Sequence, residues 1–557
     1  MTHSSHITLR QDVSGFTIRW DEQLATLARA TGEWPGLTVA QLAWQRVQQH
    51  PERVQVIDEG VSLTCEQIYQ TALRLAAYFE DLGLQPGEVV SFQLPNWWEA
   101  NAINIACAMR GLVANPIVPI NRERELTYIL NDSNSKVLFI PHVYRRFDFV
   151  DMLTRISGSL NRQPKLVVVR NSAPGLQSFD SIQRDFRGDD SLRLDVDADA
   201  VKLLMYTSGT TGQPKGVLHT HNSVHADGMK MVPALGLGPA DSTFSPSPIT
   251  HVSGYLWALN VPWLADIPVV TIDIWDPQKA LQLLKQHQCS FMLGATPFLR
   301  GLVDAARREG EPLSQLRQYL CGGAAVPPHL MYEAAETFPN CIPWRNFGAT
   351  EAMTMTRGPT SRLGLKLGAE TDGRLHQCEV KIVDPVTGVP VAPGEEGEVL
   401  VKEASMAVGY LHPEDNVGAY DSDGFFMMGD LGRIVYRDHI LITGRKKDLI
   451  IRHGENISAK EIEDALFGLT DVEDVAVVGV PDAHTGERIC AFLVCRNSRD
   501  IDLQEVVQCI SQAGLAKQKT PVQVHRLDEL PKTASGKVRK HDLRDLALKL
   551  TNEEQHS

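Results

Sequence analysis

The chain has 557 residues, too many for one ordinary hydrophobic core, so two or more domains are expected. Hydrophobic residues make up 43% and charged residues 22%, which is the profile of a soluble globular enzyme. The 54 basic and 68 acidic side chains give a formal net charge of −14, which excludes a general affinity for nucleic acid or anionic lipid. Any polyanion must therefore be bound by local cations.

Cysteine usage and the apolar stretches predict the compartment. The nine cysteines are scattered and odd in number, with no CxxC pair and no cluster with histidine, so free thiols in a reducing compartment are expected. Residues 1–10 are polar and lack an apolar signal core. The most apolar long stretch, residues 252–275, is interrupted by two prolines and two aspartates, which disfavours a membrane span. We expect a cytoplasmic enzyme without an integral membrane segment, and no pattern indicates its oligomeric state.

Strand-like and helix-like segments alternate through the first half of the chain. Thr64 and Gln67 have the spacing of a capping box, and an apolar helical face follows them as far as Gly83. Residues 97–110 are also helix-like. Short apolar runs bounded by turn residues are typical of buried strands, and they occur at residues 89–94, 137–140 and 166–169. This alternation predicts α/β layers with largely parallel sheets.

One loop has the composition of a phosphate site. After an apolar run, residues 206–217 read Tyr-Thr-Ser-Gly-Thr-Thr-Gly-Gln-Pro-Lys-Gly-Val, which offers backbone N–H groups, hydroxyl donors and one cation to a polyphosphate. The string is not GxxxxGK[ST], because Pro214 precedes Lys215 and Gly216 follows it. On composition alone, a surface turn rich in glycine and threonine is an alternative. The candidate phosphate-binding residues are Thr207, Ser208, Gly209, Thr210, Thr211, Gly212 and Lys215.

A second candidate string is Asn-Phe-Gly-Ala-Thr-Glu at residues 346–351. The Phe347 ring can stack on a purine, Thr350 can hydrogen-bond a phosphate, and Glu351 is a hard oxygen ligand suited to Mg²⁺. Each residue also has an ordinary structural explanation: a core phenylalanine, a capping threonine and a solvated glutamate. A glycine-rich turn, Gly322-Gly323-Ala324, lies upstream.

Short β-rich pieces between about 370 and 440 predict a small barrel or an antiparallel sheet. Within this region Asp430 follows a glycine, and its carboxylate can accept hydrogen bonds from both hydroxyls of a ribose. A turn aspartate is the alternative. Arg445 lies fifteen residues further on and can reach ribose and phosphate oxygens.

A charge run at residues 444–448 precedes a new set of strand and helix signals. Ser458 and Glu461 have the spacing of a capping box that opens a helix through Leu466. Strands are expected at 472–480 and 489–494, and a helix at 503–509. We therefore expect an N-terminal domain over residues 1–445 and a C-terminal domain over residues 446–557.

Near the end of the chain, residues 531–538 read Pro-Lys-Thr-Ala-Ser-Gly-Lys-Val, and Lys537 would ordinarily be a solvated charge. Together with the strings at 206–217, 346–351 and 426–458, this segment resembles the signature motifs of the adenylate-forming superfamily. That superfamily includes acyl-CoA synthetases, luciferases and the adenylation domains of peptide synthetases. The resemblance covers roughly residues 40–545, with the motifs in the family's order and spacing. It implies a large α/β domain with a small β-rich subdomain, followed by a small mobile α+β domain.

The resemblance also implies roles for single residues. Lys537 resembles the family's mobile catalytic lysine, Thr350 and Glu351 resemble catalytic residues with Glu351 on the metal, and His251 resembles a gating residue. Besides the loop at 207–215, the implied ATP-binding residues are Gly323, Phe347, Gly348, Thr350, Asp430 and Arg445. The implied acyl pocket contains His251, Gly323, Ala324 and Ala349. Lys447 resembles the hinge, and Gly454 and Glu455 resemble the side that faces coenzyme A.

Two residues depart from the family pattern. Phe347 stands where tyrosine is common, so it lacks a hydroxyl but keeps the ring. Lys447 stands where many relatives have aspartate.

Residues 245–254 stand where members of the family line the acyl pocket, and their composition restricts the class of acid that is expected as substrate. Residues 245–254 contain no aspartate that could pair with a substrate ammonium, and an unpaired buried ammonium is costly, which favours a neutral-tailed carboxylic acid. Residues 292–298 and 446–458 are similar to bacterial short- and medium-chain acyl-CoA synthetases and cyclohexanecarboxylate-CoA ligases. No carrier-protein signature follows Lys537.

These features predict an acid-CoA ligase that uses ATP, Mg²⁺ and coenzyme A. It would activate a neutral-tailed carboxylic acid, of short or medium chain length or alicyclic, as acyl-AMP, release pyrophosphate and then form acyl-CoA. One alternative is an acyl-AMP ligase that loads a carrier protein in trans. Another is a non-catalytic nucleotide-binding relative.

Overall fold

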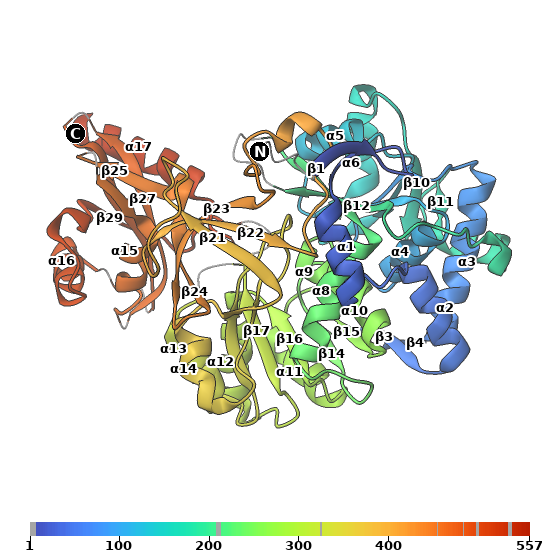
Figure 1. Cartoon of the computed structure of the whole chain (residues 1–557), viewed down its shortest axis with the longest axis horizontal. Helices are drawn as coiled ribbons and strands as arrows, with labels where there is room; N and C mark the ends of the chain where they lie inside the picture. The colour runs from blue at the N-terminus through green and yellow to red at the C-terminus, as the bar shows by residue number, and fades with distance from the viewer. Residues whose placement is uncertain are drawn as a thin grey trace.

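The computed structural model describes residues 7–207, 213–323, 326–453, 455–469, 471–482, 484–496, 499, 501–532 and 537–556. In Figure 1 the large N-terminal part runs from blue to orange, and a smaller C-terminal part is orange to red. Across the described residues, four sheets of five or more strands carry the architecture.

The first seven-stranded sheet is parallel except at its β12–β13 edge. In spatial order its strands are β11 (Gln177–Ser178), β10 (Lys165–Val169), β7 (Val137–Pro141), β5 (Val89–Phe92), β6 (Val113–Pro116), β12 (Val201–Thr207) and β13 (Lys215–Thr220). The apolar runs predicted as buried strands all lie in this sheet. Parallel strands covered on both faces have continuous apolar runs, which explains why the pattern does not alternate.

The second seven-stranded sheet is parallel except at its β3–β4 edge. In spatial order its strands are β18 (Ile342–Asn346), β17 (Gln318–Gly322), β16 (Phe291–Gly294), β14 (Thr243–Ser245), β15 (Val269–Thr271), β3 (Val54–Asp58) and β4 (Val61–Thr64). Two candidate site segments directly follow strands of this sheet, since Gly323 follows β17 and Phe347 follows β18.

One large hydrophobic core joins both sheets. It contains Val90 and Phe139 of the first sheet and Val269 and Phe291 of the second. Helix α4 (Glu99–Met109) is buried at every position, as expected for a helix enclosed on all sides. The other helices of this core are α2 (Val39–Gln49), α3 (Cys65–Asp81), α7 (Phe179–Asp185), α8 (His221–Ala234), α9 (Val252–Leu259) and α10 (Val261–Ala265).

The predicted capping box at the start of α3 is confirmed. Thr64 Oγ1 accepts a hydrogen bond from the Gln67 N–H at 3.2 Å, and Gln67 Oε1 accepts one from the Thr64 N–H at 2.9 Å. These two bonds satisfy donors that a helix start leaves unpaired.

The remaining elements of the large part cover its periphery. A second hydrophobic cluster packs four of these helices, α11, α12, α13 and α14, against the second sheet. The helices and hairpins are β1 (Ile7–Gln11), β2 (Thr17–Asp21), α1 (Glu22–Thr31), α5 (Glu123–Asp132), β8 (Val143–Tyr144), β9 (Phe147–Asp148), α6 (Phe149–Ile156), α11 (Pro277–Gln286), α12 (Thr296–Glu309), α13 (Pro328–Thr337) and α14 (Leu365–Glu370).

The β-rich region forms a six-stranded antiparallel sheet, which confirms the second of the two predicted arrangements. In spatial order its strands are β19 (Thr356–Arg357), β20 (Arg374–Leu375), β24 (His439–Arg445), β23 (Phe426–Val435), β22 (Gly397–Glu403) and β21 (Cys378–Val383). Asp430 lies in β23, and Arg445 is the last residue of β24.

The C-terminal part is a five-stranded sheet with helices on both faces. Along β27, Val475 and Val477 lie in the core shared with α15 and α16, whereas Ala476 and Val478 lie in the core shared with α17. This alternation is the period of two expected for a strand. The elements are β25 (Leu449–Arg452), β26 (Glu455–Ser458), α15 (Ala459–Leu466), β27 (Val472–Asp482), β28 (Gly486–Cys495), α16 (Leu503–Gln512), β29 (Gln523–Arg526) and α17 (Lys540–His556).

The predicted capping box at the start of α15 forms only in part. Ser458 caps the helix, since its hydroxyl accepts a hydrogen bond from the Glu461 N–H at 3.4 Å. The Glu461 side chain turns instead to Lys519, whose Nζ lies 2.5 Å from Glu461 Oε2. Lys519, from a turn distant in sequence, thus pairs with the Glu461 carboxylate that the capping-box pattern predicts to bond the backbone of Ser458.

Residues 252–275 are divided among α9, α10 and β15. Over the part of the chain that the structure describes, no helix combines the length and the apolar character needed to cross a bilayer.

Candidate active site

The hairpin of β12 and β13 places Thr207 and Lys215 opposite each other, at the end where the two strands are connected. Lys215 Nζ lies 2.9 Å from Asp415 Oδ1 and 5.3 Å from the centre of the Tyr410 ring. The predicted phosphate-binding residues between the strands, Ser208, Gly209, Thr210, Thr211 and Gly212, lie outside the described residues.

The segment after β18 folds into a tight turn. Ala349 N–H donates to Ala352 O at 2.7 Å, and Met355 N–H donates to Phe347 O at 3.1 Å. A Cβ added to Gly348 would lie 1.5 Å from Met353 O, so only glycine fits there. The Thr350 carbonyl lies 2.7 Å from Nε2 of the buried His219, whose pKa burial lowers to about 4, so His219 stays neutral. Neutral His219 therefore holds the backbone beside Glu351.

Glu351 is fixed by a phenol. The Tyr410 hydroxyl donates a hydrogen bond to Glu351 Oε1 at 3.0 Å, and the Ala407 N–H donates to the Glu351 carbonyl at 2.8 Å. Burial raises the pKa of Glu351, while Tyr410 and the cations Lys537 and Arg445 oppose the rise. A cation bound here would favour the ionised carboxylate.

Asp430 and Arg445 are partners across the β23–β24 ladder. Arg445 Nε donates to Asp430 Oδ1 at 3.1 Å. Asp430 is only 5% exposed, and burial raises its pKa, while Arg445 and Lys537 oppose the rise. The antiparallel register thus brings together two residues that are fifteen positions apart in the sequence.

Lys537 of the C-terminal part lies within electrostatic reach of this group. Burial lowers the pKa of Lys537, Arg445 and Lys447 lower it further, and Asp430 and Glu351 raise it. Lys537 in turn contributes, after burial, to lowering the pKa of His251 to about 3. Lys537 is therefore within electrostatic range of candidate residues that come from separate parts of the sequence.

The His251 ring stands at the start of α9. Its Nδ1 accepts a hydrogen bond from the Ser253 N–H at 3.4 Å and lies 3.0 Å from Ser253 Oγ. With a pKa lowered by burial, the ring is neutral at physiological pH. Its neutral state avoids repulsion with the Lys537 ammonium.

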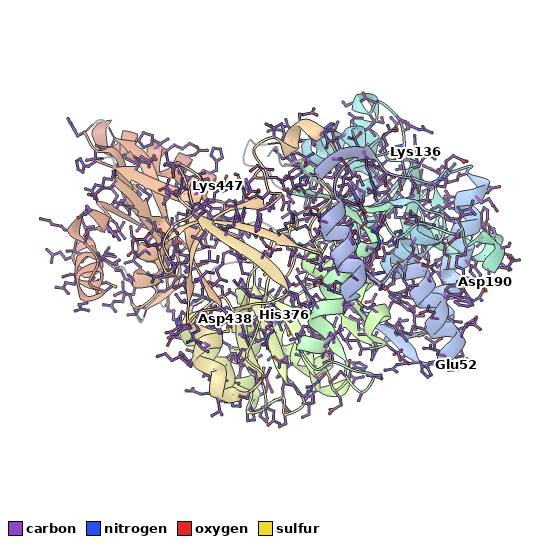
Figure 2. The ribbon with its side chains drawn as sticks, viewed as in Figure 1. Glu52, Lys136, Asp190, His376, Asp438 and Lys447 are labelled. Carbon is purple, nitrogen blue, oxygen red and sulfur yellow. The ribbon has the colours of Figure 1, made fainter. Side chains whose placement is uncertain are left out.

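The remaining predicted site residues lie in several different elements. Gly323 has φ +81°, a left-handed conformation that favours glycine, and the half-buried Phe347 packs against the core of the six-stranded sheet. Lys447 lies in a single 3₁₀ turn, Lys446–Asp448, at the junction of the two parts (Figure 2). Glu455 accepts a hydrogen bond from Gln518 at 3.0 Å. Ala324 and Gly454 lie outside the described residues.

The residues present fit a magnesium ion that is bound together with a nucleotide. Mg²⁺ usually keeps several waters and takes one or two carboxylates plus substrate phosphates. Glu351 supplies one such carboxylate. Among the described residues there is no group of three or more His, Cys, Asp or Glu side chains that could hold a metal ion.

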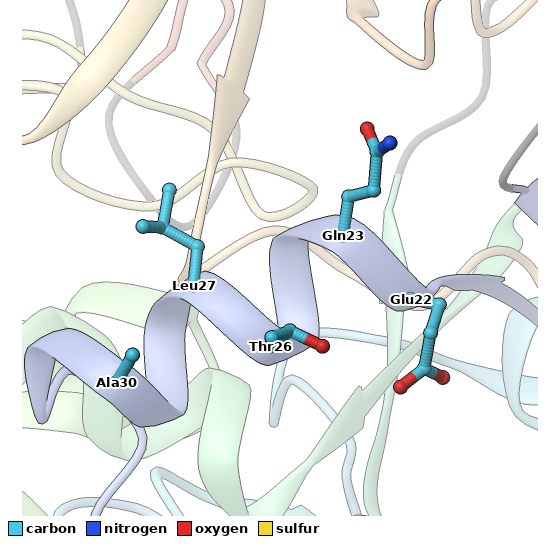
Figure 3. A pocket seen from close by; sticks show the side chains of 5 residues that line it. All are labelled: Glu22, Gln23, Thr26, Leu27 and Ala30. Carbon is cyan, nitrogen blue, oxygen red and sulfur yellow. The ribbon is translucent and has the colours of Figure 1, made fainter.

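Open hollows elsewhere on the surface contain none of these residues. One lies on α1 and is lined by Glu22, Gln23, Thr26, Leu27 and Ala30 (Figure 3). Another is lined by residues 50–53.

Several contacts at the site were not predicted. Tyr410 and Asp415 come from the segment after β22, and Asp132 from the end of α5 accepts hydrogen bonds from Tyr206 and His412. The sequence offers no local signal for them, because each pair joins segments far apart in the chain. The one sequence signal for the Asp132–Tyr206 contact is that Tyr206 is the first residue of the predicted phosphate-binding segment, 206–217.

Comparison with known proteins agrees with this geometry. Residues 43–411 match the AMP-binding enzyme family, and residues 461–537 match the AMP-binding enzyme C-terminal domain. The chain is 33% identical to the medium-chain fatty-acid–CoA ligase of Escherichia coli (strain K12), over 98% of this chain and 97% of that protein. It is 28% identical to the vibriobactin-specific 2,3-dihydroxybenzoate-AMP ligase of Vibrio cholerae, over 94% and 96%.

A solved structure shows the same fold. The crystal structure of ATP-bound MatB from Rhodopseudomonas palustris superposes with a TM-score of 0.81 at 26% identity, and the match covers 92% of this chain and 99% of that one. The predicted adenylate-forming fold, with a large N-terminal and a smaller C-terminal domain, is therefore confirmed. The chain belongs to the AMP-binding enzyme family. It is an AMP-forming acid–thiol ligase, and its substrates and cofactors are a carboxylic acid, ATP, Mg²⁺ and coenzyme A.

Proposed function

We propose that this enzyme converts a neutral-tailed carboxylic acid, of short or medium chain length or alicyclic, into its coenzyme A thioester. The observation that carries the proposal is that Lys537 lies within electrostatic range of Glu351, His251 and the Asp430–Arg445 pair, whose Oδ1 and Nε are 3.1 Å apart. Two features support the choice of acid. The segment 245–254 supplies no carboxylate for a substrate ammonium, and the relative from Escherichia coli is a medium-chain fatty-acid–CoA ligase.

In the first half-reaction the carboxylate of the acid attacks the α-phosphate of ATP. The buried carboxylate of Asp430 accepts the ribose hydroxyls, and the loop at 207–215 holds the departing phosphates with Lys215. The ammonium of Lys537 stabilises the charge that develops between the attacking carboxylate and the α-phosphate. Magnesium held at Glu351 would neutralise phosphate charge when bound. The products are acyl-AMP and pyrophosphate.

In the second half-reaction the thiol of coenzyme A attacks the acyl carbon and releases AMP. We infer that the domain boundary lies at residue 445 and that residues 446–557 rotate about the turn that contains Lys447. The rotation would withdraw Lys537 and present residues 454–455 to the thiol. Such rotations of a domain about a short segment are a common way for one site to serve two successive steps.

One specific observation favours an alternative, in which the acyl group is transferred to a carrier protein in trans and not to coenzyme A. The relative from Vibrio cholerae is named a 2,3-dihydroxybenzoate-AMP ligase, a name that contains the acyl-AMP product and does not mention coenzyme A. In that case the site would make acyl-AMP in the same way but would not use coenzyme A in the second step.

The test is a product assay. Purified protein is incubated with ATP, Mg²⁺ and aliphatic, alicyclic, aromatic and steroid-derived acids, with and without coenzyme A. We expect AMP and acyl-CoA with neutral-tailed aliphatic or alicyclic acids. Acyl-AMP that accumulates and does not react with coenzyme A would favour the carrier-loading alternative. Absence of pyrophosphate exchange with every acid would contradict both.

We also propose a cytoplasmic location. All nine cysteines lie within the described residues and are free thiols, which supports a reducing compartment.

A further inference from the structure

Among the described residues, Lys215 forms an ion pair with an acid from a different segment of the chain. Asp415 lies in the short 3₁₀ turn Pro413–Asn416, about two hundred residues beyond Lys215. Its Oδ1 is 2.9 Å from Lys215 Nζ, and the two side chains are 27% and 26% exposed. The pair is therefore reachable by a ligand and only partly screened by water.

The turn that carries Asp415 is anchored on both sides. The Tyr410 N–H donates to Asn416 Oδ1 at 3.1 Å, and His412 Nε2 lies 2.7 Å from Asp132 Oδ1. Asp132 Oδ2 also accepts a hydrogen bond of 2.6 Å from Tyr206, which is on the strand that leads into the phosphate loop. Asp415 is therefore held in place by the frame of the site itself.

The backbone before the turn is fixed as well. Leu411 N–H donates to Gly216 O at 2.7 Å, and Leu218 N–H donates to Gly409 O at 2.9 Å, so the segment runs along β13. A Cβ on Gly216 would meet Leu204 Cδ1 at 2.7 Å and Leu411 Cβ at 3.1 Å, which shows how closely the two segments approach. Lys215, with its long flexible side chain, is the partner that can move.

We propose that Asp415 is an internal counterion that competes with the terminal phosphates of ATP for Lys215. The carboxylate neutralises the ammonium while the phosphate loop is empty, and a polyphosphate must displace it to recruit the same cation. Asp415 then sets the affinity for ATP and for pyrophosphate. The proposal rests on the phosphate-binding role proposed for Lys215.

The chemistry predicts which ligands are affected. ATP and pyrophosphate carry the phosphates that Lys215 would hold, whereas AMP lacks them. Removing the Asp415 charge should therefore tighten the first two and leave AMP unchanged. A half-exposed ion pair is a weak competitor, so the expected gain in affinity is roughly two- to fivefold, and it should shrink as salt is added.

The experiment measures the dissociation constants of ATP, pyrophosphate and AMP by titration calorimetry on the full chain. The variants are Asp415→Asn, Lys215→Met and the double variant. Glu414→Gln is the matched control, because Glu414 is exposed on the same turn and makes no ion pair with Lys215 among the described residues. We expect tighter ATP and pyrophosphate binding for Asp415→Asn, no change for Glu414→Gln, and no gain from Asp415→Asn in the Lys215→Met background.

The possible contrary results distinguish a failure of the counterion proposal from a failure of the phosphate-binding role of Lys215. Unchanged or weaker ATP binding in Asp415→Asn, while Lys215→Met weakens it, overturns the counterion and leaves the proposed function intact. An equal gain for AMP, or a gain that persists without Lys215, also overturns it, because Asp415 would then act as a general negative charge. Unchanged ATP binding in Lys215→Met contradicts the phosphate role of Lys215, and the counterion falls with it.

Discussion

The Tyr410 hydroxyl and the Glu351 carboxylate are joined by a 3.0 Å hydrogen bond across 59 residues of sequence. This bond fixes the orientation of the group that we assign to the metal. Partners of this kind commonly change metal affinity by about 10–100-fold when they are removed.

We therefore expect Tyr410→Phe to raise the Mg²⁺ concentration needed for half-maximal pyrophosphate release by about tenfold. The maximal rate at saturating Mg²⁺ should change much less. Binding of Mn²⁺ with a non-hydrolysable ATP analogue, followed by electron paramagnetic resonance, provides a readout that does not depend on turnover.

Tyr420→Phe is the control for this prediction. The Tyr420 hydroxyl is buried and has no hydrogen-bond partner among the described residues, so its loss removes an equal volume without a comparable contact. Equal shifts in the two variants would mean that the Tyr410 bond does not orient Glu351.

Lys537→Ala should reduce acyl-AMP formation by about 10²–10³-fold, since it removes one electrostatic contact to the transition state. Conversion of supplied acyl-AMP to the thioester should change far less, because the role that we propose for Lys537 is confined to the first half-reaction. The two half-reactions are measured separately, by pyrophosphate exchange and by thioester formation. Lys532→Ala is the matched control, because Lys532 lies in the same segment but pairs with Asp474 at 2.6 Å. An equal loss in both half-reactions would contradict the assigned role.

Gly348→Ala should abolish most adenylation activity. The new Cβ would lie 1.5 Å from Met353 O, so the turn that carries Thr350 and Glu351 would have to open. Overpacking of this kind also costs about 1–3 kcal/mol of stability. Gly238→Ala is the comparison, because a Cβ there meets nothing within 4 Å. Rates and melting temperatures that match between the two variants would show that the turn is not needed in this form.

Lys202 predicts a pH dependence of stability. It is buried, its Nζ donates to Asn260 Oδ1 at 2.9 Å and to Asn104 Oδ1 at 3.2 Å, and burial lowers its pKa from 10.5 to about 7. Between these two values the unfolded chain binds the proton and the folded chain does not. The free energy of unfolding therefore gains up to about 1.4 kcal/mol per pH unit as the pH rises through this window. The gain is lost as the pH falls towards 7.

Lys202→Met should remove this contribution. Urea denaturation between pH 7.5 and 9 would then give a shallower rise of stability with pH than in the parent protein. Lys366→Met, at a side chain that is 70% exposed, should leave the slope unchanged. If Lys202→Met and the parent have the same slope, the lysine does not titrate as its burial requires.

Local patterns in the sequence predicted most of the elements. The Thr64–Gln67 box, the buried strand at 89–92 and the strand at 472–482 depend on neighbouring residues, and all three form. The site was predicted through its motif strings. What no local pattern contains is the packing between strings, which brings Tyr410 to Glu351, Asp415 to Lys215 and His219 to Thr350. The same reason explains the incomplete box at Ser458, where a lysine from a later turn takes the glutamate.

The pairing of Asp430 with Arg445 has a mechanical consequence. Arg445 ends β24, and the turn proposed as the pivot begins at the next residue. In a rigid-body rotation, atoms close to the axis move little and atoms far from it move much further. A swing of the C-terminal domain would therefore carry Lys537 a long way and leave Arg445 almost stationary. The adenosine part of the ligand could therefore stay bound to Asp430 and Arg445 while residues 454–455 replace Lys537 beside the reacting carbon.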